Sequence, residues 1–278
     1  MGRLAGGLAA LARDDAWPMI EAEPLPKAGF YRPGVGVLGQ MEACSGFPAA
    51  APVLPIVFYR SMLLAADAAP VDALFHALCE RGFSPVPIFV SSLKDGDALR
   101  FLEKALRDIQ PAAILAATAF ASQSDADGHT LFDRLGVPVF QVAMATTRRD
   151  GWAANARGLN PSDLAMHIVL PELDGRIFAG VISFKQPRTD GGISLVNMPE
   201  ADRVEQVASR IAAFLRLKNT SPEERRIVVL MPDYPGAAPG RTGYAVGLDV
   251  PQSVLEMLRD LADAGYCVED IPETARAL

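Results

Sequence analysis

The sequence predicts an α/β fold in which helices cover both faces of a parallel sheet. From residue 53 onward, short apolar runs alternate with segments of helical period, and this alternation is typical of parallel sheets. The apolar runs are rich in β-branched residues and are bounded by Gly or Pro, as buried strands usually are. We therefore expect flavodoxin-like or Rossmann-like units, the second of which is incomplete.

Residues 1–52 are predicted to form an irregular leader, rich in Pro and Gly, with a short amphipathic helix at residues 4–12. The apolar run in that helix is too short to span a bilayer. The leader contains a GxGxxG pattern at Gly34, Gly36 and Gly39. A dinucleotide fingerprint needs a strand before this pattern and a helix after it, and neither is predicted here. We therefore expect no nucleotide site in the leader.

Residues 53–199 are predicted to form the first α/β domain. Its expected strands are residues 56–59, 86–90, 113–117 and 137–142, and its expected helices are residues 70–82, 99–109 and 131–135. Ligands of such sheets bind beyond the carboxyl ends of the strands. The polar residues expected at that edge are Arg60, Ser61, Ser91, Ser92, Lys94, Thr118, Ser122 and Gln123. They either line a cleft there or serve as turn and helix-cap residues.

The next stretch, residues 161–198, changes character. It opens with a helix at Pro161 and continues with strands predicted at residues 168–170 and 177–184. Between these strands, Glu172 and Asp174 are two carboxylates close to an arginine. They either form a site or belong to a tight turn in which the arginine pairs with an acid. Spacing alone favours the turn.

Residues 200–278 are predicted to hold a connector helix and the start of a second α/β unit. The unit reads as a strand at residues 227–231, a helix that starts at residue 251 and a strand at residues 266–271. The loop before the helix spans nineteen residues and contains four glycines and Arg241. Such a loop is long enough to carry function. It either receives an anionic group at the helix N-terminus, or Asp249 simply caps the helix.

Composition excludes several functional classes. The net charge is −7, and no dense Lys/Arg run is present, so a nucleic-acid surface is not expected. The three cysteines are far apart and read as reduced thiols in a soluble, cytoplasmic protein. The sequence contains no P-loop, no HExxH and no GxSxG, and its three histidines share no metal-ligand spacing.

Four segments together carry a resemblance to a known family. They are Phe58-Tyr59-Arg60 with APVDALFHALCERG and PVPIFVSSLKD, RGLNPSDLAM at residues 157–166, LPELDGRI and ISFK at residues 170–177 and 182–185, and Tyr234-Pro235, Gly240-Arg241 and VGLDVPQS at residues 246–253. In order and spacing they resemble the large, tetrapyrrole-binding subunit of the ATP-dependent aerobic cobaltochelatase. This CobN-type family is related to the H-type large component of magnesium chelatase.

The resemblance implies a ligase that inserts cobalt into hydrogenobyrinic acid a,c-diamide during cobalamin biosynthesis. It implies that this chain binds the corrinoid, and that an AAA+ ATPase and a companion subunit supply ATP hydrolysis with their own ATP and magnesium. Cobalt is then a substrate, and no cofactor is expected on this chain. Arg241, Asp249, Ser253, Lys185 and Arg60 are the implied substrate-binding residues, because a corrinoid carries carboxylates and amides around an apolar ring.

The implied catalytic residues are Glu172 and Asp174, as hard ligands or as acceptors of the protons that the ring nitrogens lose. The loop departs from the family's usual GRIGNGVGLDTPAS at Thr242, Tyr244 and Val250. The chain is far shorter than the family's subunit, so we expect an N-terminal-side fragment that is inactive alone. The alternatives are a protein like the H-type component of magnesium chelatase, a non-catalytic module that recognises corrinoid or docks a partner, and an unrelated small-molecule-binding protein.

Overall fold

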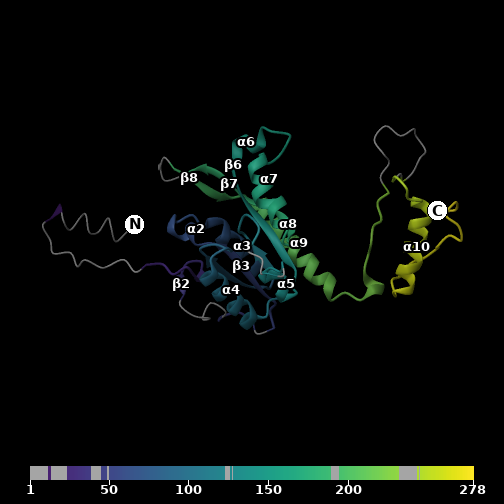
Figure 1. Ribbon diagram of the computed structural model, residues 1–278, viewed down its shortest axis with the longest axis horizontal. Coiled ribbons are helices and arrows are strands. Elements are labelled where there is room, and N and C mark those ends of the chain that lie inside the picture. Colours follow the sequence, from purple (N-terminus) through teal and green to yellow (C-terminus); the bar gives the residue numbers. More distant parts are fainter. Residues whose placement is uncertain are drawn as a thin grey trace.

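The computed structural model is built around an eight-stranded mixed sheet with the order β2-β1-β4-β3-β5-β6-β7-β8 (Figure 1). It describes residues 12–13, 24–38, 45–48, 50–122, 126, 128–188, 194–231, 243 and 245–278. The strands are β1 (Ala28–Arg32), β2 (Gly36–Leu38), β3 (Val53–Tyr59), β4 (Ser84–Val90), β5 (Ile114–Ala116), β6 (Val139–Arg148), β7 (Ile177–Pro187) and β8 (Leu195–Pro199).

The α-helices are α2 (Arg60–Leu64), α3 (Ala69–Cys79), α4 (Gly96–Ile109), α5 (Leu131–Leu135), α6 (Arg149–Ala153), α7 (Pro161–Leu164), α8 (Leu170–Glu172), α9 (Ala201–Lys218) and α10 (Val250–Asp263). A π-helical turn, η2 (Ala165–Val169), joins α7 to α8, and a 3-10 turn, η3 (Pro222–Glu224), follows α9.

The centre of the sheet confirms the predicted parallel α/β arrangement. Strands β4, β3, β5, β6 and β7 are parallel, and their spatial order is the flavodoxin-like 2-1-3-4-5 when β3 is counted first. The antiparallel strands β1, β2 and β8 extend the sheet at its two edges. The order of the strands therefore reverses between β3 and β5, where such folds place a ligand.

Helices cover both faces of the sheet, as the continuous apolar strands require. Leu54, Ile56 and Phe58 of β3 pack with the inner faces of α3 and α9. Val57, on the opposite face of β3, packs with α4 and α5. The predicted helices at residues 70–82, 99–109 and 131–135 are thus present as α3, α4 and α5, with shifts of a few residues at their ends.

The predicted irregular leader contains regular structure, which corrects that interpretation. Strands β1 and β2 form a hairpin that pairs with β4 at the edge of the sheet. Gly34 and Gly36 both have positive φ, and Gly34 lies in the hairpin connection between the two strands. An antiparallel hairpin is not the context of a dinucleotide fingerprint, so no nucleotide loop is formed by these two residues. Gly39 and nearly all of the predicted helix at residues 4–12 lie outside the described residues.

The strand predicted at residues 168–170 is wrong. These residues continue the helical path from α7 through η2 into α8, which crosses from the end of β6 to the start of β7. A short apolar run fits a helix as well as a strand, because periodicity alone does not separate them. Strand β7 confirms the prediction for residues 177–184, whereas the antiparallel strand β8 was not predicted.

The second predicted unit forms only in part. Helix α10 is present, but residues 227–231 and 266–271 are not strands. Helix α9, predicted as a connector, packs against β7 and α3 of the main sheet. Figure 1 shows residues 219–231, which follow α9, leading away from the main sheet without joining one of its strands.

Candidate functional site

The candidate site lies at the carboxyl end of β5, beside the point where strand order reverses. Tyr59 is the last residue of β3, and Thr118 and Ala119 are the second and third residues after the end of β5. The Tyr59 hydroxyl donates a hydrogen bond to the Ala119 carbonyl oxygen at 2.8 Å. This bond joins the ends of the two central strands and fixes the start of the loop that follows β5.

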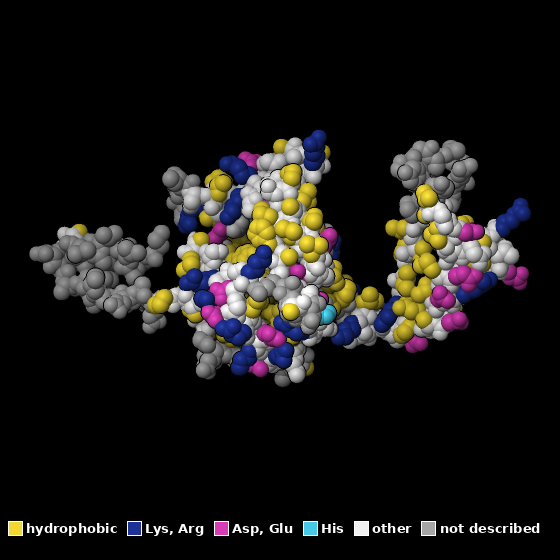
Figure 2. Space-filling model, viewed as in Figure 1, with side chains coloured by type: hydrophobic (Ala, Val, Ile, Leu, Met, Phe, Trp, Pro, Cys, Tyr) yellow, Lys and Arg dark blue, Asp and Glu magenta, His cyan; other side chains and the backbone are white. Residues whose placement is uncertain are grey.

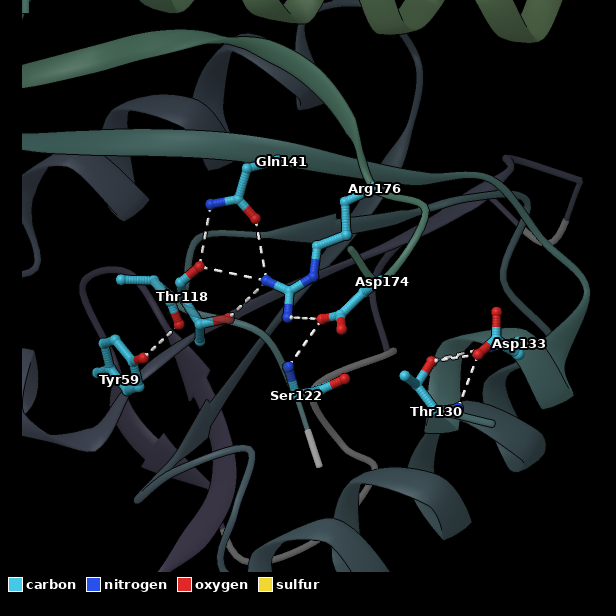
Figure 3. A network of polar contacts seen from close by, with 9 residues as sticks. Tyr59, Thr118, Ser122, Thr130, Asp133, Gln141, Asp174 and Arg176 are labelled. Atoms are coloured by element: carbon cyan, nitrogen blue, oxygen red, sulfur yellow. Dashed lines mark hydrogen bonds and ion pairs between the residues drawn. The ribbon is translucent and has the colours of Figure 1, made fainter. Parts of the chain in front are cut away.

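A buried ion pair holds that loop at Ser122 (Figure 3). The Arg176 guanidinium lies 2.6 Å from an Asp174 carboxylate oxygen, and their side chains are 0% and 4% exposed. Asp174 also accepts a hydrogen bond from the Ser122 backbone N–H at 2.8 Å. The carboxylate thus holds the loop after β5 against the residues that begin β7.

Arg176 extends the network into the sheet. One of its nitrogens donates to the Gln141 amide oxygen at 3.0 Å and to the Thr118 carbonyl oxygen at 3.3 Å. The Gln141 amide nitrogen donates to the same Thr118 carbonyl at 2.9 Å. Figure 3 shows the guanidinium lying between Gln141 and Asp174, with its plane directed at Thr118. Three strands are therefore joined through one arginine.

Burial sets the electrostatics of this network. Loss of water around the guanidinium lowers the pKa of Arg176, and the adjacent Asp174 opposes this effect. Burial raises the pKa of Tyr59, although the positive charge of Arg176 acts in the opposite direction. An arginine stays charged at neutral pH even when buried, so Asp174 is required as its counter-ion. The network is therefore suited to holding a loop in place.

A second buried carboxylate fixes the other end of the crossover helix. The Asp163 side chain is fully buried and accepts hydrogen bonds from the backbone N–H and hydroxyl groups of Thr146 and Thr147 at the end of β6. Asn160 caps α7 and also donates to the Thr147 hydroxyl. Burial by itself raises the pKa of Asp163, but the hydrogen bonds from Thr147 and Thr146 outweigh it and leave the pKa below its usual value.

His167 lies one turn further along, inside η2. Its ring is buried, and Nε2 is 3.9 Å from Asp163. Burial lowers the pKa of His167, and the Asp163 charge only partly opposes this, so the ring is neutral at physiological pH. Its Nδ1 atom has no hydrogen-bond partner among the described residues. Together, Asp163 and His167 place a π-helical turn at the middle of the crossover.

The predicted substrate-binding lysine contributes to a third polar cluster. Lys185 of β7 lies 3.3 Å from an Asp67 carboxylate oxygen. Asp67 also accepts hydrogen bonds from the backbone and side-chain nitrogens of Asn197 in β8. This cluster attaches the β7–β8 hairpin to the segment between α2 and α3. Lys185 keeps a quarter of its side chain exposed, so it is the more accessible member of the cluster.

The two predicted catalytic carboxylates lie in different environments. Glu172 is exposed at the end of α8, whereas Asp174 is buried in the ion pair with Arg176. Gly175 has a φ of 69° and forms the corner between Asp174 and Arg176. The predicted tight turn with an internally paired arginine is therefore confirmed.

The other predicted residues do not gather at one place. The Arg60 guanidinium donates to the Leu25 carbonyl oxygen at 2.7 Å. Asp249 caps α10 by accepting from the Gln252 N–H, and the Ser253 hydroxyl donates to the Asp249 carbonyl oxygen. Arg241 lies outside the described residues. Apart from the Asp249–Ser253 bond, no hydrogen bond or ion pair joins two of the predicted site residues that the structure describes.

Of the polar residues predicted at the carboxyl edge, several serve as turn or cap residues. Ser91 donates to Asp95, which caps α4, and the Ser92 hydroxyl accepts from the Lys94 N–H. Gln141, Thr146 and Thr147 were missed, because they occur within an apolar strand and only the fold shows what they contact. Gln123 lies outside the described residues.

Two features are absent from the described part of the chain. No group of three or more His, Cys, Asp or Glu residues among the described residues is arranged to hold a metal ion. No helix in the described part is both long enough and apolar enough to cross a membrane.

Comparisons with known proteins agree in what they find. Residues 4–278 match the family model described as CobN/Magnesium Chelatase. The chain is 36% identical over 273 residues to the aerobic cobaltochelatase subunit CobN of Sinorhizobium sp, which covers 92% of this chain and 21% of that protein. It is 34% identical over 275 residues to the subunit of the same name from Pseudomonas aeruginosa, covering 96% of this chain and 22% of that protein.

More distant relatives and a solved structure extend this result. The chain is 29% identical over 238 residues to the magnesium-chelatase ChlH subunit of Oryza sativa subsp. indica, covering 82% of this chain and 17% of that protein. The catalytic subunit of cobaltochelatase from Mycobacterium tuberculosis is similar in structure, with a TM-score of 0.71 and 26% identity, covering 97% of this chain and 22% of that one. The chain thus spans about a fifth of the length of the curated cobaltochelatase subunits it matches.

Proposed function

The chain belongs to the CobN/magnesium chelatase family, and we propose that it forms part of the large, tetrapyrrole-binding subunit of an aerobic cobaltochelatase. In this role the complete subunit inserts cobalt into hydrogenobyrinic acid a,c-diamide. The observation that carries the proposal is the similarity to two cobaltochelatase subunits, at 36% and 34% identity over more than nine-tenths of the chain. The fold supports the proposal through its TM-score of 0.71 with a cobaltochelatase catalytic subunit.

The proposal divides the work between this chain and other polypeptides. The sequence contains no P-loop, so ATP hydrolysis falls to an AAA+ partner that carries its own magnesium. Cobalt is the substrate metal and enters with the corrinoid. We propose that this chain alone recognises the corrinoid without completing metal insertion.

Two exposed positions suit contact with the corrinoid better than the buried ones. Lys185 offers a partly exposed ammonium that can meet a carboxylate or amide on the edge of the macrocycle. Glu172 is an exposed carboxylate able to accept a proton from a ring nitrogen. Asp174 is buried, and its Oδ2 atom accepts from both Arg176 and Ser122, so we assign it the role of positioning the loop after β5.

The three C-terminal candidates lie before or within the N-terminal end of α10. Asp249 is the N-cap of that helix and Ser253 lies in its first turn, at the helix end whose dipole favours an anionic group. Arg241 precedes them in the glycine-rich segment of the sequence and supplies a cation suited to carboxylates.

An absorbance titration with hydrogenobyrinic acid a,c-diamide tests the proposal, with protoporphyrin IX as the competing ligand. We expect the corrinoid to bind at least about tenfold more tightly, which is about 1.4 kcal/mol. Lys185→Ala and Arg241→Ala are expected to weaken corrinoid binding several-fold. Lys104→Ala is the matched control, because Lys104 lies on α4 with its side chain 83% exposed and pairs only with Asp108 at 3.3 Å.

The same titration separates the alternatives. Tighter binding of protoporphyrin IX favours a protein like the H-type component of magnesium chelatase, an assignment supported by the 29% identity to a ChlH subunit. Retention of an AAA+ partner on the immobilised chain, without any tetrapyrrole binding, favours a docking module. If neither ligand nor partner binds, the proposal is wrong.

A further inference from the structure

The segment after η3 exposes an apolar surface that no other described part of the chain covers. Residues 226–231 are extended, and the side chains of Val228 and Leu230 are 80% and 83% exposed. Ile227 is also half exposed. Figure 2 shows hydrophobic side chains gathered along this segment and the adjacent face of α10. Consecutive exposed β-branched and aliphatic residues are costly in water unless another surface covers them.

The backbone of this segment is also unpaired. Among the described residues, no backbone hydrogen bond involves residues 226–231 or residues 267–272. Six consecutive extended residues without a partner present a row of N–H and C=O groups to any incoming strand. Another strand can replace water as the partner of every group in such a row.

The two faces of the segment differ in exposure. Val229 and Met231 are half-buried, whereas Val228 and Leu230, on the alternate face, are exposed. Val254 and Leu255 of α10 are buried, at 8% and 1% exposure. A strand that is apolar on both faces is typical of the interior of a parallel sheet with helices on each side. Here only one helix layer is present.

Residues 266–271, which follow α10, are joined to the start of residues 226–231 by a side-chain contact. The Arg225 guanidinium donates to the Tyr266 hydroxyl at 3.1 Å and lies 5.9 Å from the centre of its ring. Residues 266–271 therefore begin next to the start of residues 226–231, with α10 between them in the chain. The order of residues 226–231, α10 and residues 266–271 is that of a parallel βαβ unit whose strands have not paired, and Asp270, with a φ of 55°, departs from strand geometry.

We infer that residues 226–231 are an inner strand of a second parallel sheet, and that a β-strand from another segment of the longer subunit completes it. This rests on the proposed function in that it requires a subunit of the relatives' length, of which this chain matches about a fifth. The family match runs through residue 278, so this unit lies within the family's shared region. A second copy of this chain would pair one backbone edge but would bring no helix to cover Val228 and Leu230.

Hydrogen–deuterium exchange tests the inference. The isolated chain is compared with a chimera in which these 278 residues replace the matching stretch of the Sinorhizobium subunit. In the isolated chain, amides 227–231 are expected to exchange at nearly unprotected rates while β3 stays protected. In the chimera, the same amides are expected to exchange at least about 100-fold more slowly, as in a packed sheet.

A pair of substitutions adds a second readout. Val228→Lys with Leu230→Lys should abolish the protection in the chimera and leave the thermal unfolding of the isolated chain unchanged. The control is Glu223→Gln with Glu224→Gln, which adds the same net charge at exposed residues of η3 and should leave protection intact. Exchange protection and thermal unfolding do not depend on tetrapyrrole binding. Failure of the proposed function would appear in the absorbance titration, and failure of this inference would appear in the exchange rates.

Two results would overturn the inference. Equal, fast exchange in the chimera would mean that no segment of the subunit pairs with residues 227–231. Protection in the isolated chain that rises with protein concentration, together with the mass of a dimer, would mean that a second copy covers the segment instead.

Discussion

Strand β3 and residues 227–231 have nearly the same composition and different structures. Leu54, Ile56 and Phe58 are fully buried at the centre of the main sheet. Val228 and Leu230, in an equally apolar and β-branched run, are more than three-quarters exposed. Strand β3 has β4 and β5 on its sides and helices on both faces, whereas residues 227–231 pair with no strand among the described residues.

The difference shows that an apolar run specifies a strand only together with its neighbours. β-Propensity describes how well a side chain fits a pleated, covered surface, and it does not by itself fix the backbone. The main sheet provides that surface and, in addition, anchors its loops through buried polar networks. The C-terminal segment has the pattern without the surface. Substitutions in the main sheet should therefore lower the free energy of unfolding more than substitutions in residues 227–231.

The largest effect is expected from Asp174→Ala in the main sheet. This change leaves the Arg176 guanidinium buried without its counter-ion, and breaking a buried pair in this way typically costs about 3–5 kcal/mol. Urea denaturation followed by circular dichroism measures the loss in the free energy of unfolding. The control is Asp150→Ala, which removes an exposed partner of Arg148 and is expected to leave the unfolding midpoint unchanged. Equal shifts in both variants would contradict the role assigned to the buried pair.

Asp163→Asn is expected to have the next largest effect. An amide cannot accept all the hydrogen bonds that Thr146 and Thr147 donate to the carboxylate, and a hydrogen bond to a charged group is worth about 1.5–3 kcal/mol. The same urea titration measures this loss. Because Thr146 and Thr147 are in β6, we expect β6 and the crossover helix to lose exchange protection together. Loss of protection confined to the helix would contradict the role of Asp163 in joining the helix to β6.

The pH dependence of stability gives an independent check on Asp163. Its pKa is lower in the folded protein than in the unfolded chain, so its contribution is complete above the ordinary aspartate pKa of about 3.9. The contribution is lost as the pH falls through the lowered value. Asp163→Asn should therefore flatten the acid limb below about pH 4. His167 acts in a different window, because its lowered pKa removes stability as the pH falls below about 6.5.

The sequence predicted the parallel centre of the fold well and the site poorly, for physical reasons. Strands such as β3 and β4 are apolar on both faces, so local pattern suffices to find them. The hairpin β1–β2 pairs with a strand more than fifty residues later, and no local signal reports that pairing. Arg176 was expected to pair with a nearby acid, but its contacts with Gln141 and Thr118 depend on strands that meet only in the folded sheet.

In the C-terminal region, Asp249→Ala tests whether Asp249 only caps α10 or also contacts the corrinoid. Asp249 caps α10, and loss of such a cap typically costs about 1 kcal/mol of helix stability. Asp249→Ser keeps a capping oxygen and should restore α10, as measured by exchange of its first-turn amides. If Asp249 also meets the corrinoid, the serine variant will recover the helix without recovering binding. Recovery of both would assign Asp249 to capping alone.

The smallest effect is expected at Val228, where the same deletion made at a buried valine of β3 provides the comparison. Val57→Ala in β3 removes methyl groups from a site with 0% exposure and is expected to cost about 1.5–3 kcal/mol. Val228→Ala removes the same groups from a site that is 80% exposed, and the free energy of unfolding should change by less than about 0.5 kcal/mol. A comparable cost at both sites would show that residues 227–231 are already covered in the isolated chain. The two apolar runs would then differ in their neighbours but not in their burial, and no additional strand would be needed to cover the second one.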